Sequence, residues 1–339
     1  TPNNIIAKVS RIEIARQFFS PPPEKLVALL LEKGLITQEE ADLSAYIPMA
    51  QDLTAEADSG GHTDNRPALT LLPTMMALKN EFMATYHYRE PLCVGLAGGI
   101  ATPESAAAAF GMGAAYILTG SVNQSCVEAG ICDDVKKILC QAEQADVAMA
   151  PAADMFEIGA RVQVLKRGTL FPLRAEKLFK LYRSHDNFDD IDEKSKKEIQ
   201  EKFLQAGFED AWKSTKDFFL KTGNMKEIER AQNDSKHKMA LVFRSYLGLS
   251  SKWAIQGNLK RKMDYQIWCG PAIGAFNQWV KGSFLETCEN RKTAEIALNL
   301  LFGSCICIRA SILKAQGINL PMGTGVFKPM KQKEICTFL

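Results

Sequence analysis

The chain has 339 residues, of which 46% are hydrophobic and 24% charged, and its formal net charge at pH 7 is +2. This is the composition of a globular protein with enough apolar residues for one large core or two smaller ones. A near-neutral charge with dispersed basic residues argues against nucleic acid as a partner, since nucleic-acid-binding domains gather Lys and Arg on one face. We therefore expect chemistry on small molecules.

The nine cysteines are odd in number and lack the paired spacing of small disulfide-rich domains. We therefore expect reduced, buried thiols in a cytoplasmic protein. We expect no signal peptide and no apolar segment as long as the roughly 18 residues that a membrane span requires. The first residues are Thr-Pro rather than Met, which suggests the start of a fragment or of a processed chain.

Short apolar runs alternate with helix-like segments before residue 150. The runs are IIAKVS (5–10), DLTAEA (52–57), LCVGLAGG (92–99) and AAYILTGS (114–121). Helix-like segments such as EIARQFF, ALTLLPTMMALKNEFMATY and TPESAAAAFGMG follow the first three of these runs. This alternation is typical of βαβ units and predicts a parallel sheet.

The pattern changes after residue 150 to long amphipathic segments, which predict helices. They are RAEKLFKLYRSH, EKSKKEIQEKFLQAGFEDAWKSTKDFFLK and ENRKTAEIALNLLFGSCICIRASILKAQG. The mixed acidic and basic stretch 186–203 is typical of a solvated helix face rather than of a binding patch. We therefore predict two domains, an α/β domain over residues 1–150 and a helical one over residues 151–339.

Small and hydroxylated residues follow the last two predicted strands. Gly98 and Gly99 come after one strand, and Thr119, Gly120 and Ser121 come after the next. Unhindered N–H groups and hydroxyls at adjacent strand ends favour a phosphate, as in the phosphate site of a (β/α)8 barrel. The alternative is that the glycines only make tight turns. The Gly-x-Gly-x-x-Gly fingerprint of a dinucleotide-binding domain is not matched here.

Five longer motifs carry a resemblance to a known family. They are EADSGGHTDNRP, GLAGGIATPESAAAAFGMGAAYILTGSVNQSCVEAG, MAPAADMFEIGARVQVLKRGTLFP, RAQNDSKHKMALVFRSYLGLSSKW and MDYQIWCGPAIGAFNQWV. Together they resemble the trans-acting enoyl reductases of polyunsaturated fatty acid and polyketide synthases. This family is more distantly similar to nitronate monooxygenases and FMN-dependent enoyl reductases. The resemblance implies an FMN-binding (β/α)8 TIM barrel with a helical insertion or extension.

The length of the α/β part departs from this pattern. A complete barrel takes about 200 to 250 residues, and the four predicted strands would correspond to strands 5 to 8. We therefore expect the chain to be the C-terminal half of such a barrel followed by a mainly helical extension. The missing N-terminal half, or a partner, would have to cover the sheet edge at residues 5–10, and without it we expect weak FMN binding.

The resemblance assigns roles to the polar loop after residues 52–57. Gly60 and Gly61 would let the backbone pass beside the flavin, and His62 is the candidate catalytic residue, as a proton donor or a substrate-orienting group. A purely structural histidine is the alternative. The following Asp64, Asn65 and Arg66 either order the loop or bind the phosphopantetheine of an acyl carrier protein.

Other residues have weaker signals. Lys8 is either a flavin contact or a surface lysine, and Asn123 and Gln124 either contact the cofactor or cap a helix. Glu56 or Asp58 is a candidate to fix the tautomer of His62. No role is assigned to the remaining histidines, and no metal site is expected. The aromatic stretch YQIWCGPAIGAFNQW (265–279) either packs the helical part or lines an acyl tunnel.

The implied reaction is reduction of a 2-enoyl thioester on an acyl carrier protein, with FMN as cofactor and NADPH as reductant. A nitronate monooxygenase-type oxidoreductase is one alternative, and a non-catalytic docking fragment of a megasynthase is another. Neither a nucleic acid partner nor a membrane span is expected, and a homodimer is left open.

Overall fold

The structure is a computed structural model that describes residues 4–338. It contains two compact units. Unit 1 comprises residues 4–59, 63–127 and 275–338, and unit 2 comprises Gly60–His62 and Glu128–Gly274. The chain thus passes between the units several times, and the predicted domain division at residue 150 stays a prediction.

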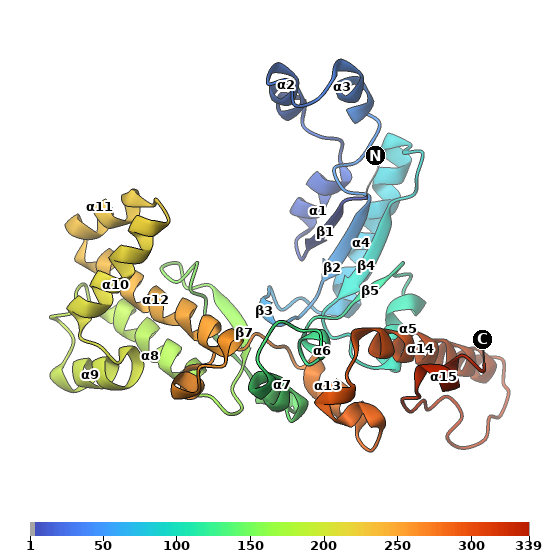
Figure 1. The fold of residues 1–339 in the computed structure, drawn as a ribbon. Coiled ribbons are helices and arrows are strands. Elements are labelled where there is room, and N and C mark those ends of the chain that lie inside the picture. The colour runs from blue at the N-terminus through green and yellow to red at the C-terminus, as the bar shows by residue number, and fades with distance from the viewer. Residues whose placement is uncertain (1–3, 339) are drawn as a thin grey trace. The chain divides into compact units, whose positions relative to one another are not determined.

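Unit 1 is built on a four-stranded sheet in the order β1-β2-β4-β5, with every neighbouring pair parallel (Figure 1). The strands are β1 (Ile6–Val9), β2 (Asp52–Glu56), β4 (Cys93–Ala97) and β5 (Ile117–Leu118). Each lies within one of the four predicted apolar runs. The interiors of β2 and β4 are buried on both faces, as is typical of parallel strands covered by helices. The α/β class with a parallel sheet is therefore confirmed.

Helices connect these strands and continue at the C-terminal end of the chain. They are α1 (Ile12–Phe19), α2 (Glu24–Glu32), α3 (Gln38–Ser44), α4 (Ala68–Tyr86), α5 (Pro103–Gly111), α6 (Ser121–Gln124), α13 (Ala272–Val280), η4 (Phe284–Glu286), η5 (Cys288–Asn290), α14 (Thr293–Ala315) and α15 (Gln332–Ile335). A capping box between Thr102 and Ser105, with Pro103 in the first turn, explains why α5 begins just after β4. Within the described residues β1 is an edge strand, and the assignment to strands 5–8 of a barrel stays a prediction.

Helix α14 meets the length and hydropathy of a membrane span, which we expected no segment to do, although the described residues contain no clear membrane span. Its mean hydropathy reaches 1.9 over an 18-residue window, so it is long and apolar enough to cross a membrane by length and composition. Its Gly303, however, lies so close to Phe327 and Pro103 that a Cβ there would stand 2.5 Å and 2.7 Å from their side chains. Helix α14 thus packs on α5 along one face, and only 33% of its apolar window is buried.

The cysteines only partly match the prediction. Cys126 and Cys269 are buried free thiols, as expected, whereas Cys305 and Cys336 are free but exposed. Cys140 and Cys288 are in the disulfide-bonded state, so the prediction of nine reduced thiols is wrong at these two positions.

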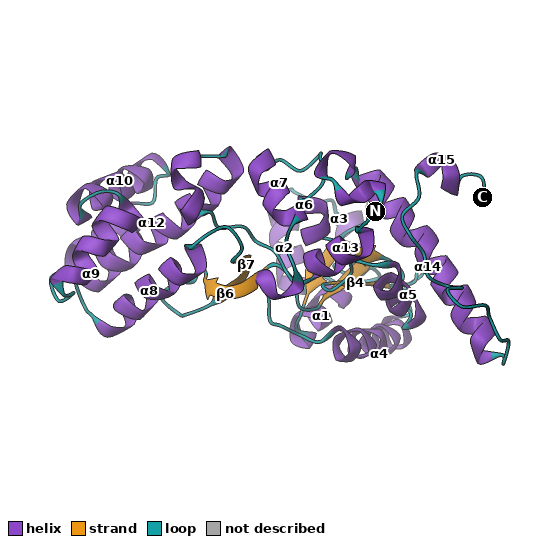
Figure 2. Ribbon diagram, turned by 90° about the horizontal axis from the view of Figure 1, so that it is seen from below, coloured by secondary structure: helices purple, strands orange, loops and turns teal. Residues whose placement is uncertain are grey.

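Unit 2 combines a small antiparallel sheet with a group of helices (Figure 2). Its strands, in the order β3-β7-β6, are β3 (Gly61–His62), β7 (Arg161–Leu165) and β6 (Val147–Pro151). Its helices are α7 (Asp133–Cys140), η1 (Gln144–Asp146), α8 (Phe171–Ser184), α9 (Glu193–Glu198), η2 (Ile199–Leu204), α10 (Phe208–Lys221), α11 (Met225–Asn233), α12 (Ser235–Gln256) and η3 (Leu259–Asp264). Two of the predicted amphipathic segments form α8 and the stretch from α9 to α10, and the third forms α14 of unit 1. Strands β6 and β7 were not predicted.

The long helix α12 organises the core of unit 2, because α8, α10, α11 and η3 all pack against it. Asp234 caps its N-terminus by accepting the N–H of His237, and Gly257 ends it with a φ of +70°. The next turn brings Asp264 to Tyr246 of α12, whose hydroxyl donates to Asp264 over 2.6 Å. A buried carboxylate therefore lies against the central helix.

Two guanidinium groups complete this buried cluster. Arg174 of α8 donates to the Asp264 carboxylate, and Arg261 Nε lies 3.2 Å from it. The Asp264 side chain is only 2% exposed and that of Arg261 only 6%. Arg261 also stacks 3.8 Å from the Trp253 ring centroid. Burial is the main cause that raises the pKa of Tyr246, followed by the adjacent Asp264 charge.

We expect Asp264→Ala to lower the free energy of unfolding by about 3–5 kcal/mol, because it leaves two buried guanidinium groups without their shared carboxylate. Urea denaturation followed by circular dichroism measures this. The control is Asp186→Ala, whose exposed carboxylate pairs only with Lys236 among the described residues; it should cost less than about 1 kcal/mol. Equal, small losses in both variants would contradict the assigned importance of the cluster.

Candidate functional site

The predicted phosphate loops lie next to each other in unit 1. Strands β4 and β5 are parallel neighbours with Ala97 opposite Leu118. The loops that start at Gly98 and Thr119 therefore leave the sheet at the same end, where both strands have their carboxyl ends. Gly98 and Gly99 have φ values of +88° and +76°, which favour glycine. A Cβ at Gly98 would stand 2.6 Å from Asp58 O, whereas Gly99 and Gly120 have no atom within 4 Å of that position.

These loops have the donors and the space that a phosphate needs. Within residues 4–338, the N–H groups of Gly98, Gly99 and Gly120 make no hydrogen bond. The Thr119 hydroxyl donates to Asn123 Oδ1 over 3.0 Å, which leaves its oxygen able to accept. A small anion in front of two side-chain-free positions would satisfy the unpaired N–H groups. The loops therefore fit the phosphate end of FMN.

A second observation at the same place concerns Gln124 at the end of α6. Its Oε1 atom is buried and has no hydrogen-bond partner in the described part of the chain. A buried acceptor without a partner is costly and is rare in folded proteins. The hydroxyl groups of a ribityl chain are donors that would satisfy it, so Gln124 adds to the fit with FMN.

A buried arginine holds α6 in position. Arg291 Nη1 donates to Ser125 Oγ over 3.1 Å, and its Nε donates to Leu285 O over 2.9 Å. Its guanidinium also lies 5.0 Å from the Phe276 ring centroid. Burial lowers the pKa of Arg291 to about 10, so it still carries its charge at neutral pH. Phe276, one of the predicted tunnel residues, thus packs against the support of α6.

His62 lies in unit 2, on the two-residue strand β3. This strand pairs with β7, with His62 opposite Val162 and Gly61 opposite Gln163. His62 Nε2 lies 3.0 Å from Asp154 Oδ1. The imidazole also meets the Trp268 ring edge-on, with 5.3 Å between centroids and 87° between planes. His62 is therefore held by a carboxylate and by an indole.

The glycines before His62 are explained by close packing. A Cβ on Gly60 would stand 2.8 Å from the backbone of Cys269, and one on Gly61 would stand 2.8 Å from the Trp268 ring. Burial raises the pKa of the neighbouring Cys269 thiol to about 12, so this thiol stays protonated and is no nucleophile. The structure thus gives both glycines a role in holding β3 against residues 268–270. Their predicted flavin contact stays a prediction.

Asp154 is the carboxylate partner that sequence reasoning missed. Burial acts to raise the pKa of Asp154, but the hydrogen bond and charge of His62 outweigh it, so this pKa is lowered. Its carboxylate accepts from the Nε2–H tautomer of His62, which leaves Nδ1 available to a ligand. No partner of Nδ1 is found in residues 4–338. The pair has the arrangement of a histidine oriented for acid–base work.

The other candidate residues near the loop make hydrogen bonds and ion pairs within unit 1. Glu56 accepts from Lys8 Nζ over 2.5 Å and from Ser59 Oγ over 3.0 Å, so it is not the carboxylate that holds His62. Asp64 accepts from Ser10 and from Arg11, which lower its pKa. These contacts tie residues 63–66 to the start of α1, as expected of a loop-ordering role. Phosphopantetheine binding there stays a prediction.

Two signals in the sequence pointed to the missed parts of the site. Asp154 follows the short apolar run VAMAP, in the same way that His62 follows residues 52–57. The segment RVQVL alternates valine with polar residues, as is typical of a strand, and it forms β7. His237, to which no role was assigned, is only 2% exposed and contacts two carboxylates.

Comparison with known proteins adds two kinds of similarity. Residues 185–265 match the family model of the inserted helical domain of [acyl-carrier-protein] S-malonyltransferase. The chain is 46% identical over 318 residues to a polyunsaturated fatty acid synthase component of Thraustochytrium sp., which covers 92% of the chain and 21% of that protein. It is 49% identical over 306 residues to the polyketide biosynthesis protein PksE of Bacillus subtilis, which covers 90% of the chain and 39% of that protein.

The chain spans less than two fifths of the length of each of these two relatives. A solved structure is matched over a larger share of its own length. It is the enoyl reductase domain of MlnA from the macrolactin biosynthesis cluster of Bacillus amyloliquefaciens, 40% identical with a TM-score of 0.87. The match covers 92% of this chain and 70% of that one. An enoyl reductase is an oxidoreductase, so this likeness supports an oxidoreductase. The chain belongs to the family of the MlnA enoyl reductase domain.

Proposed function

We propose that the protein is an FMN-dependent enoyl reductase that acts in trans on 2-enoyl thioesters of acyl carrier protein. The observation that carries the proposal is the His62–Asp154 pair, which holds a histidine with Nδ1 available in a chain of an enoyl reductase family. The relatives are a polyketide biosynthesis protein and a polyunsaturated fatty acid synthase component, which supports a role for this chain in the same kind of biosynthesis.

We assign FMN binding to the two loops of unit 1. Gly98, Gly99, Thr119, Gly120 and Ser121 would hold the phosphate, because the glycines offer unpaired N–H groups and the other two residues carry hydroxyls. Gly99 and Gly120 also leave open space for it. Reduced FMN, when bound, supplies a hydride to the β-carbon of the enoyl thioester. NADPH is the proposed reductant, and Gly60 and Gly61 retain their proposed place beside the flavin.

His62 supplies the proton that completes the reduction. Addition of a hydride at the β-carbon leaves an enolate, and a proton must then be added at the α-carbon. His62 donates this proton from Nδ1, while Asp154 accepts from Nε2–H and stabilises the charged ring before transfer. After the transfer the same hydrogen bond keeps the neutral ring in the Nε2–H tautomer.

The proposed partners follow from the substrate. An acyl carrier protein must present the thioester, so the protein acts next to a fatty acid or polyketide synthase. The barrel half that would cover the edge of β1 is part of the proposal, whereas a homodimer is left open.

Turnover of two substrates tests this function. Protein that includes the proposed N-terminal barrel half and is reconstituted with FMN should oxidise NADPH when crotonyl thioester of acyl carrier protein is added, because the site supplies a proton for an enolate. The measurement is the loss of NADPH absorbance together with the mass of the saturated product. Oxygen consumption with an alkyl nitronate alone would indicate the monooxygenase-type alternative. Absence of flavin absorbance and of both activities would indicate a docking fragment.

Gly120→Ala tests the phosphate loops separately. The residue has a φ of −109° and open space around its Cβ position, so we expect the fold to remain while the methyl group crowds the phosphate. Loss of one charge-assisted hydrogen bond, worth about 1.5–3 kcal/mol, should raise the Kd for FMN about tenfold or more. Flavin fluorescence titration measures this Kd.

Gly111→Ala is the matched control, since it also introduces a methyl group into open space but lies at the end of α5. Its Kd for FMN should equal that of the unchanged protein. Riboflavin, which lacks the phosphate, should bind the Gly120→Ala variant as it binds the unchanged protein. An unchanged Kd for FMN in Gly120→Ala would remove this loop from the proposed site.

A further inference from the structure

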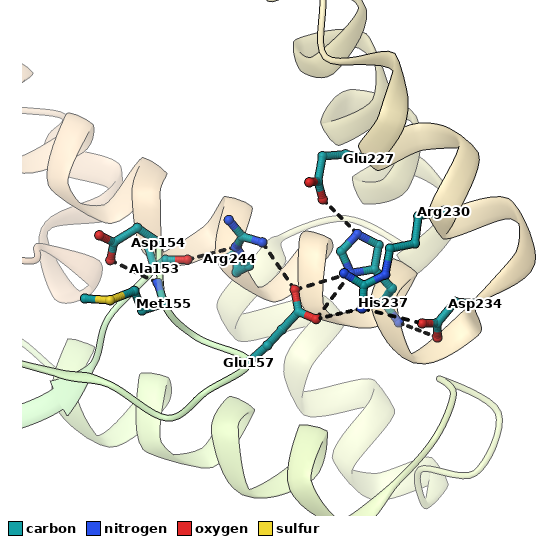
Figure 3. Close-up of polar contacts among 9 residues, drawn as sticks. All are labelled: Ala153, Asp154, Met155, Glu157, Glu227, Arg230, Asp234, His237 and Arg244. Carbon is teal, nitrogen blue, oxygen red and sulfur yellow. Dashed lines mark hydrogen bonds and ion pairs between the residues drawn. The ribbon is translucent and has the colours of Figure 1, made fainter. Parts of the chain in front are cut away.

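A group of charged side chains in unit 2 surrounds the turn that carries Asp154. The turn joins β6 to β7, and the helices α11 and α12 supply the charged groups (Figure 3). None of these groups touches His62 in the described contacts. Arg244, however, contacts the turn itself at Ala153 and Glu157.

Arg244 of α12 contacts the turn on both sides of Asp154. Its Nε donates to Ala153 O over 2.9 Å, and its Nη1 donates to Glu157 Oε1 over 3.3 Å. Figure 3 shows the guanidinium reaching both acceptors. One rigid group thus fixes the residue before Asp154 and the residue three positions after it. We call Arg244 with these two acceptors the clamp.

The Glu157 carboxylate is held from other directions as well. His237 Nδ1 lies 3.3 Å from it, and Arg230 Nη2 lies 3.4 Å from it. The second ring nitrogen of His237 lies 2.8 Å from Glu227 of α11. Three cationic or polar donors therefore orient one carboxylate, which makes Glu157 a defined partner for Arg244.

The turn itself is anchored in the core beside the clamp. Phe156 is fully buried and packs against Phe179, Tyr182 and Phe243, the last being the residue before Arg244. Asp154 is exposed by comparison, with 63% of its side chain accessible. An exposed side chain has little packing of its own to fix it, so its direction depends on the backbone of the turn.

We propose that Arg244 is a positioning residue for the proposed enoyl reductase reaction: through Ala153 O and Glu157 it fixes the turn that presents Asp154 to His62 Nε2. The inference rests on the proposed function, but its structural part concerns only the state of His62. Without the clamp, Asp154 no longer holds Nε2–H, and Nδ1 is not reliably the nitrogen that releases its proton to the substrate. A displacement of about 1 Å in such a group costs about 10²-fold in rate.

The test uses Arg244→Met in the full chain with ¹⁵N-labelled histidine. The chain has only four histidines, so the two ring nitrogens of His62 can be assigned by comparison with His62→Gln. At about pH 8.5 the unchanged protein should show the Nε2–H tautomer, and Arg244→Met should show averaged shifts from two tautomers. The kcat for enoyl thioester should fall about 10- to 100-fold, with KM changed less than about threefold.

Two further variants distinguish positioning from charge or folding. Arg230→Met also removes a guanidinium from Glu157 but has no contact with Ala153 O, so it should keep the His62 tautomer. Arg244→Lys keeps the charge and the long stem, so it should fold, yet its ammonium lacks the planar fork that holds both acceptors. It should show the same tautomer averaging as Arg244→Met.

The result that overturns the inference is a single Nε2–H tautomer of His62 in Arg244→Lys and in any folded Arg244→Met. Averaged tautomers in Arg230→Met would also overturn it, because the effect would then follow charge at Glu157. The tautomer is measured without turnover. A protein that shows no enoyl reduction would therefore refute the proposed function, and the tautomer measurement would still test the role of the clamp.

Discussion

The packing of two side-chain-free residues, Gly60 and Gly61, against residues 268–270 determines where His62 lies. Any Cβ at these positions would stand 2.8 Å from the Cys269 backbone or the Trp268 ring, which is closer than atoms can approach. Since β3 has only two residues, it has few hydrogen bonds of its own to hold it. Its place depends on this close approach and on pairing with β7.

Unit 2 then supplies everything that acts on the His62 ring in the described contacts. The indole of Trp268 lies against one edge of it, and the turn between β6 and β7 brings Asp154 to Nε2. The helices behind that turn contribute through Arg244 and Glu157. In our proposal, a helical segment similar to an acyltransferase insertion therefore has a task beyond packing, which is to set the geometry of a small sheet.

In unit 1, the parallel register of neighbouring strands positions the candidate phosphate loops. Because Ala97 lies opposite Leu118, the loops after β4 and β5 start side by side, and their glycines leave room at the sheet edge. Arg291 supports α6 from behind with hydrogen bonds to Ser125 and Leu285. The two loops thus form a concentrated set of backbone donors without any charged side chain of their own.

Much of unit 1 could be predicted from the sequence, since its four apolar runs are bounded by glycines and polar residues and lie on a regular βα repeat. The partner of His62 could not be predicted in this way. Asp154 is 92 residues from His62 along the chain, and no local sequence pattern indicates a contact between residues so far apart. Glu56 and Asp58 were the obvious carboxylates because they are near in sequence, but Glu56 is held by Lys8 and Ser59.

The short strands of unit 2 were missed for a related reason. Strand β7 has five residues, and all but Arg161 are buried, so its alternation is brief and stands between longer helical patterns. The disulfide-bonded state of Cys140 and Cys288 had no local signal, because neither cysteine belongs to a closely spaced pair in the sequence. Contacts between distant segments decide these features, and sequence periodicity does not record them.

The most direct test of the proposed role of His62 is the pair of half-reactions of His62→Ala. Reduction of bound flavin by NADPH should be unchanged, because His62 has no part in hydride uptake from the nucleotide. Reoxidation by crotonyl thioester, followed by stopped-flow absorbance, should slow by about 10²- to 10⁴-fold, the usual contribution of a positioned acid. Reoxidation at the rate of the unchanged protein would contradict this role, and so would loss of bound flavin, which would make His62 a cofactor-binding or structural residue.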